Sequence, residues 1–151
     1  MEWIFWAIVG AAVIHVAEEY LGNWVGWVQR FAPGVTLAQF VVVNAAFVVL
    51  CIAGAVVGAS NLVLSLSMAS LIFVNALIHL APTIKVRRYS PGAASALVLY
   101  VPLALYAYYQ AARSGRLTVP DGVRATLLGM LWMALPAGFQ LARLRIQGRH
   151  G

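Results

Sequence analysis

The chain has 151 residues, of which 63% are hydrophobic and 9% charged, and its mean hydropathy is +0.88. This composition excludes an ordinary soluble domain, and the basic residues behind the net charge of +6 stand between apolar segments, where they set membrane topology and do not indicate a nucleic-acid partner. The single cysteine, Cys51, excludes an intrachain disulfide or a site of several thiolates. Because a bilayer core needs about 20 apolar helical residues per crossing, the length fits about four to six crossings in one domain over residues 1–151.

Five apolar segments predict an all-α integral membrane bundle of about five transmembrane helices. We expect the spans at residues 3–21, 37–59, 62–84, 91–112 and 123–144. The stretch between the first two mixes Gly and Trp with polar residues, which predicts an interfacial loop or a short surface helix. Gly54 and Gly58 form a GxxxG pair, which is typical of membrane helices that approach closely.

Basic residues set the expected orientation of this bundle. With five crossings, seven basic residues fall on one side of the membrane and three on the other. Because basic residues are enriched on the cytoplasmic side, this predicts an outside N-terminus and a cytoplasmic C-terminus. That cytoplasmic side holds Arg30, Lys85, Arg87, Arg88, Arg143, Arg145 and Arg149, and the opposite side holds Arg113, Arg116 and Arg124. We expect the bacterial inner membrane as the location and membrane lipid as a partner, and a homodimer stays open.

Ionisable residues stand inside the first and third apolar segments. Glu18 and Glu19 follow His15 by three and four positions, so the three side chains share one face of a helix. An ionisable group within a span costs ~2.5 to 3.5 kcal/mol on insertion scales unless it is paired or hydrated, which makes this face a candidate functional site. Asn75 and His79 likewise lie one helical turn apart in the third segment.

The expected depth in the bilayer brings these residues together. At ~1.5 Å of rise per residue, His15, His79 and Asn44 each lie ~8 to 12 Å from the end of their span on the predicted cytoplasmic side. The antiparallel topology therefore predicts one polar site in the cytoplasmic half of the bundle. Its expected members are His15, Glu18, Glu19, Asn44, Asn75 and His79.

Two imidazoles and a carboxylate form the ligand set of catalytic zinc and mononuclear iron sites with open coordination positions. The sequence thus indicates a candidate divalent metal site, for Zn or Fe, with His15, Glu18 and His79 as ligands, or with Glu19 in place of Glu18. The candidate catalytic residues are Glu18, Glu19, Asn44 and Asn75. A glutamate would act as general base, and an asparagine would orient a ligand or donate to an oxyanion. This set predicts a hydrolase or oxidoreductase acting on a small lipophilic substrate.

The same residues allow three other interpretations. Without a metal, His15 and a neighbouring glutamate could move a proton on a lipophilic substrate, which predicts an isomerase. Buried acids and histidines also carry protons in membrane transporters, so a proton-coupled carrier or a lipophile-binding protein stays open. The cluster could also be purely structural and tie helices together through hydrogen bonds.

The string HVAEE at residues 15–19 resembles the motif that names the HXXEE family of small bacterial membrane proteins. Asn75 and His79 resemble that family's later Asn-xxx-His element. The resemblance covers the first three apolar segments and implies a shared fold and a shared polar site. It implies neither a substrate nor a reaction, because no activity is established for the family.

Overall fold

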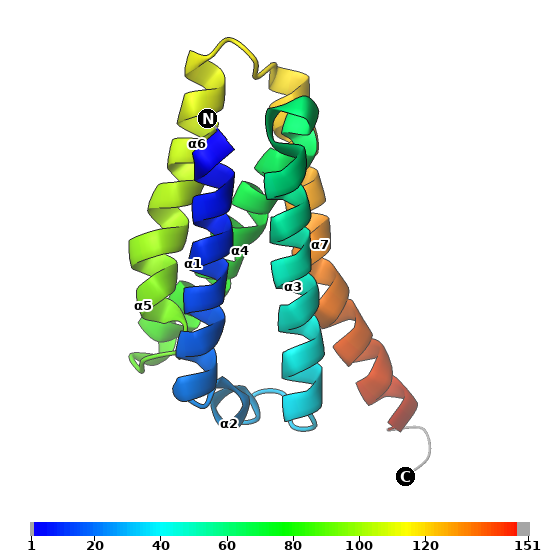
Figure 1. The fold of residues 1–151 in the computed structure, drawn as a ribbon. Coiled ribbons are helices and arrows are strands. Elements are labelled where there is room, and N and C mark those ends of the chain that lie inside the picture. Colours follow the sequence, from blue (N-terminus) through cyan, green and yellow to red (C-terminus); the bar gives the residue numbers. More distant parts are fainter. Residues whose placement is uncertain (1, 148–151) are drawn as a thin grey trace.

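The computed structural model describes residues 2–147, and these form helices and connecting turns without a strand. Five long helices run up and down the molecule, each antiparallel to the one before (Figure 1). They are α1 (Glu2–Leu21), α3 (Leu37–Val57), α4 (Leu62–Val86), α6 (Val101–Arg113) and α7 (Val119–Gln147). The side chains of residues 137 and 139–147 lie outside the description. The basic residues Arg143, Arg145 and Arg149, which the topology prediction used, therefore lie outside it too.

Short elements join the long helices. The helix α2 (Trp24–Val28) lies between α1 and α3 at the lower end of Figure 1, in the stretch where a loop or short surface helix was predicted. The 3-10 turn η1 (Gly58–Asn61) joins α3 to α4. A single turn, α5 (Ala93–Ser95), and a π-helical segment, η2 (Ala96–Tyr100), run directly into α6. The fourth predicted segment is therefore one continuous helical stretch with a widened turn near its start.

Capping residues explain where the helices begin and end. Thr36 and Gln39 form a capping box at the start of α3, since the Gln39 N–H donates to Thr36 Oγ1 at 3.3 Å and the Thr36 N–H to Gln39 Oε1 at 2.9 Å. Asn61 caps α4 by accepting the Leu64 N–H at 3.1 Å. Gly58 has a φ of +49°, a left-handed conformation that ends α3 and lets α4 turn back beside it.

The predicted all-α fold with five long helices is confirmed, and most helix ends lie within a few residues of the predicted limits. The start of α7 differs most, because this helix begins at Val119 and the prediction began at residue 123. Thr118 accepts the Asp121 N–H at 3.3 Å and so caps the first turn. Pro120 also fits there, since the first helical turn needs no backbone donor.

Helix α4 is central and contacts α1, α3, α6 and α7. Its buried side chains include Leu66, Met68, Leu71 and Ile72. At Gly54 a Cβ would lie 2.5 Å from Met68 Cγ, so α3 and α4 approach more closely than a larger residue would allow. This contact fits the packing role expected of the GxxxG pair.

Large apolar side chains are exposed on all five long helices, whereas His15, His79 and several serines are buried inside. Examples of the exposed group are Val13, Ile14, Val42, Val49, Val56, Ile78, Leu105 and Leu127. Among the described residues, two helical stretches are long and apolar enough to cross a membrane, Glu2–Leu21 and Leu37–Val86. The second stretch contains α3 and α4 with the η1 turn between them.

Candidate functional site

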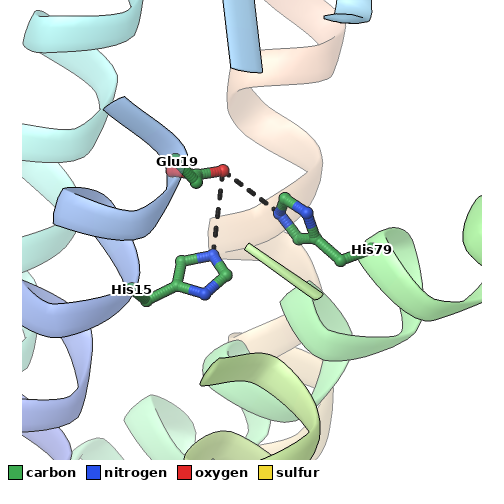
Figure 2. Close-up of side chains that lie close together, drawn as sticks. All are labelled: His15, Glu19 and His79. Atoms are coloured by element: carbon green, nitrogen blue, oxygen red, sulfur yellow. Dashed lines mark ion pairs between the residues drawn. The ribbon is translucent and has the colours of Figure 1, made fainter. Parts of the chain in front are cut away.

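Three ionisable side chains from two helices meet inside the bundle (Figure 2). His15 and Glu19 lie one turn apart on α1, and His79 reaches them from α4. The Glu19 Oε1 atom lies 3.7 Å from His15 Nε2 and 3.1 Å from His79 Nε2. His15 is 0% exposed, His79 2% and Glu19 4%. One carboxylate oxygen therefore faces two imidazole nitrogens, shielded from solvent.

The two imidazoles pack against each other and against Tyr100 and Gly92. Their ring centroids lie 4.8 Å apart with an interplanar angle of 85°, an edge-to-face contact. Tyr100 packs against His15 with ring centroids 4.4 Å apart. Gly92 lies against both rings, because a Cβ at this position would be 2.8 Å from Cε1 of His15 and of His79. The space between the rings and residue 92 therefore admits only glycine.

A serine holds the second nitrogen of each imidazole. Ser95 Oγ lies 2.9 Å from His15 Nδ1, and Ser90 Oγ lies 3.3 Å from His79 Nδ1. Each hydroxyl also donates to a nearby backbone carbonyl, at 3.3 Å for Ser95 and 3.5 Å for Ser90. Because a hydroxyl has only one proton to donate, Ser95 then accepts a hydrogen bond from His15, which puts the ring proton of His15 on Nδ1. The Ser90 contact to its carbonyl is longer, and His79 Nε2 lies within hydrogen-bond distance of Glu19 Oε1, so the contacts of His79 fit a proton on either ring nitrogen.

With its proton on Nδ1, His15 directs an Nε2 lone pair toward the Glu19 carboxylate, which also faces His79 Nε2. Acceptors that face one another repel unless a proton or a cation lies among them. His15 Nε2 is buried and has no hydrogen-bond partner among the described residues, which is a costly state for a polar atom. The geometry therefore suits a positively charged species shared by the three side chains.

Two of the three distances among these atoms are close to those of a divalent metal site. The three ligand atoms all lie within 4.8 Å of one another. Tetrahedral zinc, with bonds of about 2.0 to 2.1 Å to nitrogen and oxygen, separates its ligands by about 3.3 to 3.4 Å. The distances from Glu19 Oε1 to the two Nε2 atoms, 3.7 and 3.1 Å, lie on either side of that value. The third separation, between the two imidazoles, is up to 4.8 Å, so the rings would have to move toward each other to complete such a site.

Glu18 faces a different part of the molecule. Its Oε1 accepts the backbone N–H of Gly92 at 3.0 Å and of Ala94 at 3.2 Å, and its Oε2 accepts the Ser95 N–H at 2.8 Å. The Tyr89 hydroxyl also donates to Oε1. This carboxylate thus caps the helical stretch that begins with α5, where the helix dipole stabilises a negative charge.

Tyr89 lies in the turn between α4 and α5, and its hydroxyl stays protonated when it donates to Glu18. Partial desolvation and the neighbouring Glu18 carboxylate both raise the pKa of Tyr89 above its usual range. The phenol is therefore a permanent donor at physiological pH.

The two adjacent glutamates therefore lie in different surroundings. The sequence favoured Glu18 as the carboxylate ligand beside His15 and His79, but the carboxylate between the two imidazoles is that of Glu19. Both oxygens of Glu18 are held by backbone amides. Both glutamates share a helix face with His15, so the tertiary contacts determine which of them faces the imidazoles.

The two predicted asparagines also differ in position. Asn44 on α3 interacts with the Glu19 side chain, and its Nδ2 donates to Phe40 O at 3.1 Å. Asn75 lies one turn before His79 on α4. Its Oδ1 is buried without a hydrogen-bond partner among the described residues. Among these two asparagines, the described contacts thus connect Asn44 with the cluster through Glu19.

The family model that matches this chain is described as "Protein of unknown function with HXXEE motif", and it matches residues 6–107. The chain belongs to the HXXEE family. This HXXEE protein has its whole His–Glu cluster, the serines and Gly92 inside the matched region, which confirms the resemblance seen in the sequence. Neither a curated protein nor a solved structure matches the chain.

Four residues of this HXXEE site were not predicted as members of it: Ser90, Gly92, Ser95 and Tyr100. The string Ser-Pro-Gly at residues 90–92 is typical of a turn and was a signal that the backbone bends here. Nothing in its spacing indicates that this turn lies against imidazoles from other segments. Tyr100 ends the π-helical segment, a feature that occurs frequently at functional sites.

A cavity of about 450 Å³ reaches Glu19 from the end of the bundle that holds α2. It lies among α1, α2 and the first turn of α3. Its lining residues are Glu19, Tyr20, Leu21, Asn23, Trp24, Val25, Leu37 and Phe40. Most of the cavity wall is apolar, and the side chain of Glu19 forms part of it.

Proposed function

We propose that this HXXEE protein is an integral membrane enzyme that binds Zn²⁺ or Fe²⁺ at His15, Glu19 and His79 and acts on a small lipophilic substrate. The observation that carries the proposal is the convergence of two Nε2 atoms and one carboxylate oxygen within 4.8 Å in the buried interior. A divalent ion would satisfy all three acceptors at once. Three protein ligands also leave a coordination position open, which is typical of catalytic sites.

The serines support the same proposal. Metal-ligating histidines usually donate their other ring N–H to a neighbouring group, which fixes the tautomer and the ring orientation. Ser95 and Ser90 lie in that position, at 2.9 and 3.3 Å from the two Nδ1 atoms. Asn44, which interacts with Glu19, is placed to orient this carboxylate or a substrate oxygen. Hydrolysis and oxidation are the reaction classes that use this ligand set.

The cavity at Glu19 supports a lipophilic substrate. Trp24 and Phe40 lie in contact on its wall, with ring centroids 5.8 Å apart. On the opposite side of the site, buried core residues such as Ile8, Ala12 and Phe47 fill the bundle. A carrier needs a path to both sides of the membrane, whereas an enzyme needs one entrance. The cavity that includes Glu19 opens at the α2 end of the bundle, and this single entrance to the site favours the enzyme.

A metal-free acid–base enzyme is the second candidate, and one distance favours it. Glu19 Oε1 lies 3.1 Å from His79 Nε2, which suits a hydrogen bond. The Ser90 hydroxyl makes only a 3.5 Å contact to its carbonyl, so it could donate to His79 Nδ1 and leave the ring proton on Nε2. The pair would then move a proton on the substrate, as an isomerase requires.

Metal analysis of the purified protein distinguishes the two candidates. We expect about one zinc or iron per chain in the wild type, and none in His15→Ala or His79→Ala, because two ligands hold an ion much less tightly than three. His150→Ala, which removes the remaining histidine of the chain, is the matched control and should keep the metal. A wild type that neither contains metal nor binds added Zn²⁺ would favour the metal-free candidate.

The proposed location is the bacterial inner membrane, with the site in the cytoplasmic half. The exposed apolar side chains on all five long helices support insertion, since such a surface is not stable in water. Lys85, Arg87 and Arg88 lie at the end of the bundle that holds α2, which favours the cytoplasm at that end and an outside N-terminus.

Single-cysteine labelling tests this orientation in a Cys51→Ala background. We expect a membrane-impermeant maleimide to label Ser60→Cys and Ser114→Cys in intact cells, because both residues are exposed at the end opposite α2. Gln29→Cys, which is exposed at the other end, should react only after the cells are permeabilised. The reverse pattern would overturn the orientation, and labelling of no position in intact cells would argue against insertion.

A further inference from the structure

We propose that Glu18 is the positioning residue of this site. Its carboxylate fixes the segment 90–95, and that segment holds both imidazoles in the orientation that directs their Nε2 atoms at Glu19. The inference rests on the proposed metal site and gives separate roles to the two adjacent glutamates of the motif, since Glu19 binds the ion and Glu18 acts through its neighbours.

The segment 90–95 supplies the outer contacts of both histidines. Ser90 and Ser95 bond the two Nδ1 atoms, at 3.3 and 2.9 Å. Gly92 lies against Cε1 of each ring. A shift of this segment would therefore change the orientation of both rings, and with it the direction of both Nε2 atoms.

Glu18 connects α1 to the backbone of this segment. Its two oxygens accept three backbone N–H groups, of Gly92, Ala94 and Ser95, at 2.8 to 3.2 Å. Gly22, one turn further along, packs against Pro91, since a Cβ there would lie 2.7 Å from Pro91 Cβ. The same helix that presents His15 and Glu19 thus also fixes the segment that orients both imidazoles.

The arrangement of donors makes a carboxylate necessary at this position. Oε1 accepts from Gly92 and Ala94, and Oε2 accepts from Ser95. In a Glu18→Gln variant the amide oxygen can keep the first two bonds, but its NH₂ group then faces the Ser95 N–H, and two donors cannot pair. The variant therefore specifically loosens Ser95, the residue that bonds His15 Nδ1.

The test compares Glu18→Gln with Glu2→Gln in purified full-length protein. Glu2 is a matched control because its Oε1 also accepts a backbone N–H, that of Ala59 at 3.0 Å, at the opposite end of α1. We expect Glu18→Gln to bind Zn²⁺ about 10- to 100-fold more weakly, the usual effect of losing an outer partner of a ligand. The visible absorption bands of bound Co²⁺ should also change, because they report the ligand geometry. Glu2→Gln should match the wild type in both.

A metal-free measurement separates this inference from the metal proposal. In protein labelled with ¹⁵N-histidine, the ring signals of His15, assigned with His15→Ala, report its tautomer without any ion. We expect Glu18→Gln to shift them and Glu2→Gln to leave them unchanged. If the wild type binds no metal but Glu18→Gln shifts these signals, the metal proposal fails and the positioning role stands.

Two results would overturn the positioning role. One is a Glu18→Gln protein with the wild-type zinc affinity, Co²⁺ spectrum and His15 signals. The other is an equal loss of affinity in Glu2→Gln, which would indicate a general effect on packing. If Glu18→Gln does not fold, Ser95→Ala is the alternative variant, because it removes only the hydroxyl that bonds His15 Nδ1. It should weaken Zn²⁺ binding about 10-fold, and unchanged binding would contradict the proposal.

Discussion

A Glu19→Gln variant is expected to lose metal binding while it keeps its fold. The amide has almost the same shape as the carboxylate, but it is neutral and a poor metal ligand. Because Glu19 Oε1 is the atom that faces both imidazoles, its loss removes the charge that balances a divalent ion in the buried site. We expect the zinc affinity to fall by more than about 100-fold, the upper limit for the loss of an outer contact.

Thermal unfolding in detergent, with and without Zn²⁺, measures this effect and checks the fold. Without metal, Glu19→Gln should melt at or above the wild-type temperature, since it removes a buried charge that lacks a counterion. With free zinc at about 100 times the dissociation constant, the wild type alone should gain about 2.7 kcal/mol of stability. Equal zinc stabilisation of the two proteins would show that this carboxylate is not a ligand.

The helices and the meeting of His15 with His79 could be predicted because they follow from local periodicities. Apolar segments long enough to cross a bilayer become helices, and each residue of a helix adds a fixed rise along its axis. In an antiparallel bundle, equal distances from the same end bring side chains to the same level. His15 on α1 and His79 on α4 meet for this reason, although 64 residues (79 − 15) separate them in the chain.

The choice between Glu18 and Glu19 could not be made from the sequence. Residues three and four positions after His15 are both neighbours of it on a helix, so the spacing alone allows either carboxylate. The start of α5 decides, because its free N–H groups bind Glu18 and leave Glu19 to the imidazoles. That contact joins parts of the chain more than 70 residues apart, as the spacing of 77 between Glu18 and Ser95 illustrates.

The serines around the histidines were missed for the same physical reason. A serine in an apolar helix can bond the carbonyl of the preceding turn, as Ser65, Ser67 and Ser70 do in α4, so it gives no sign of a distant partner. Ser90 and Ser95 look no different in the sequence. Only the turn of the backbone at Gly92, with a φ of +96°, brings them to the two imidazoles.

Gly92→Ala is expected to disrupt the site far more than its small size suggests. An alanine at a φ of +96° is strained, which costs about 1 to 2 kcal/mol. Its Cβ would also lie 2.8 Å from Cε1 of both imidazoles and 2.9 Å from His79 Nδ1, distances that real Cβ atoms do not show. The rings must therefore move away from residue 92 and from the serines, and zinc affinity should fall by about 100-fold or more.

Gly115→Ala separates the effect of backbone strain from the effect of the contact with the imidazoles. Gly115 also has a positive φ, of +68°, but a Cβ there meets nothing within 4 Å. Both variants should lower the melting temperature through backbone strain, and only Gly92→Ala should also lose zinc binding and shift the ring signals of His15. Zinc titration and thermal unfolding of the two proteins provide the comparison. If both kept the wild-type affinity, the contact of residue 92 with the imidazoles would not hold the site together. The orientation of the two imidazoles would then need another cause, because the backbone turn at Gly92 is what brings the serines to their Nδ1 atoms.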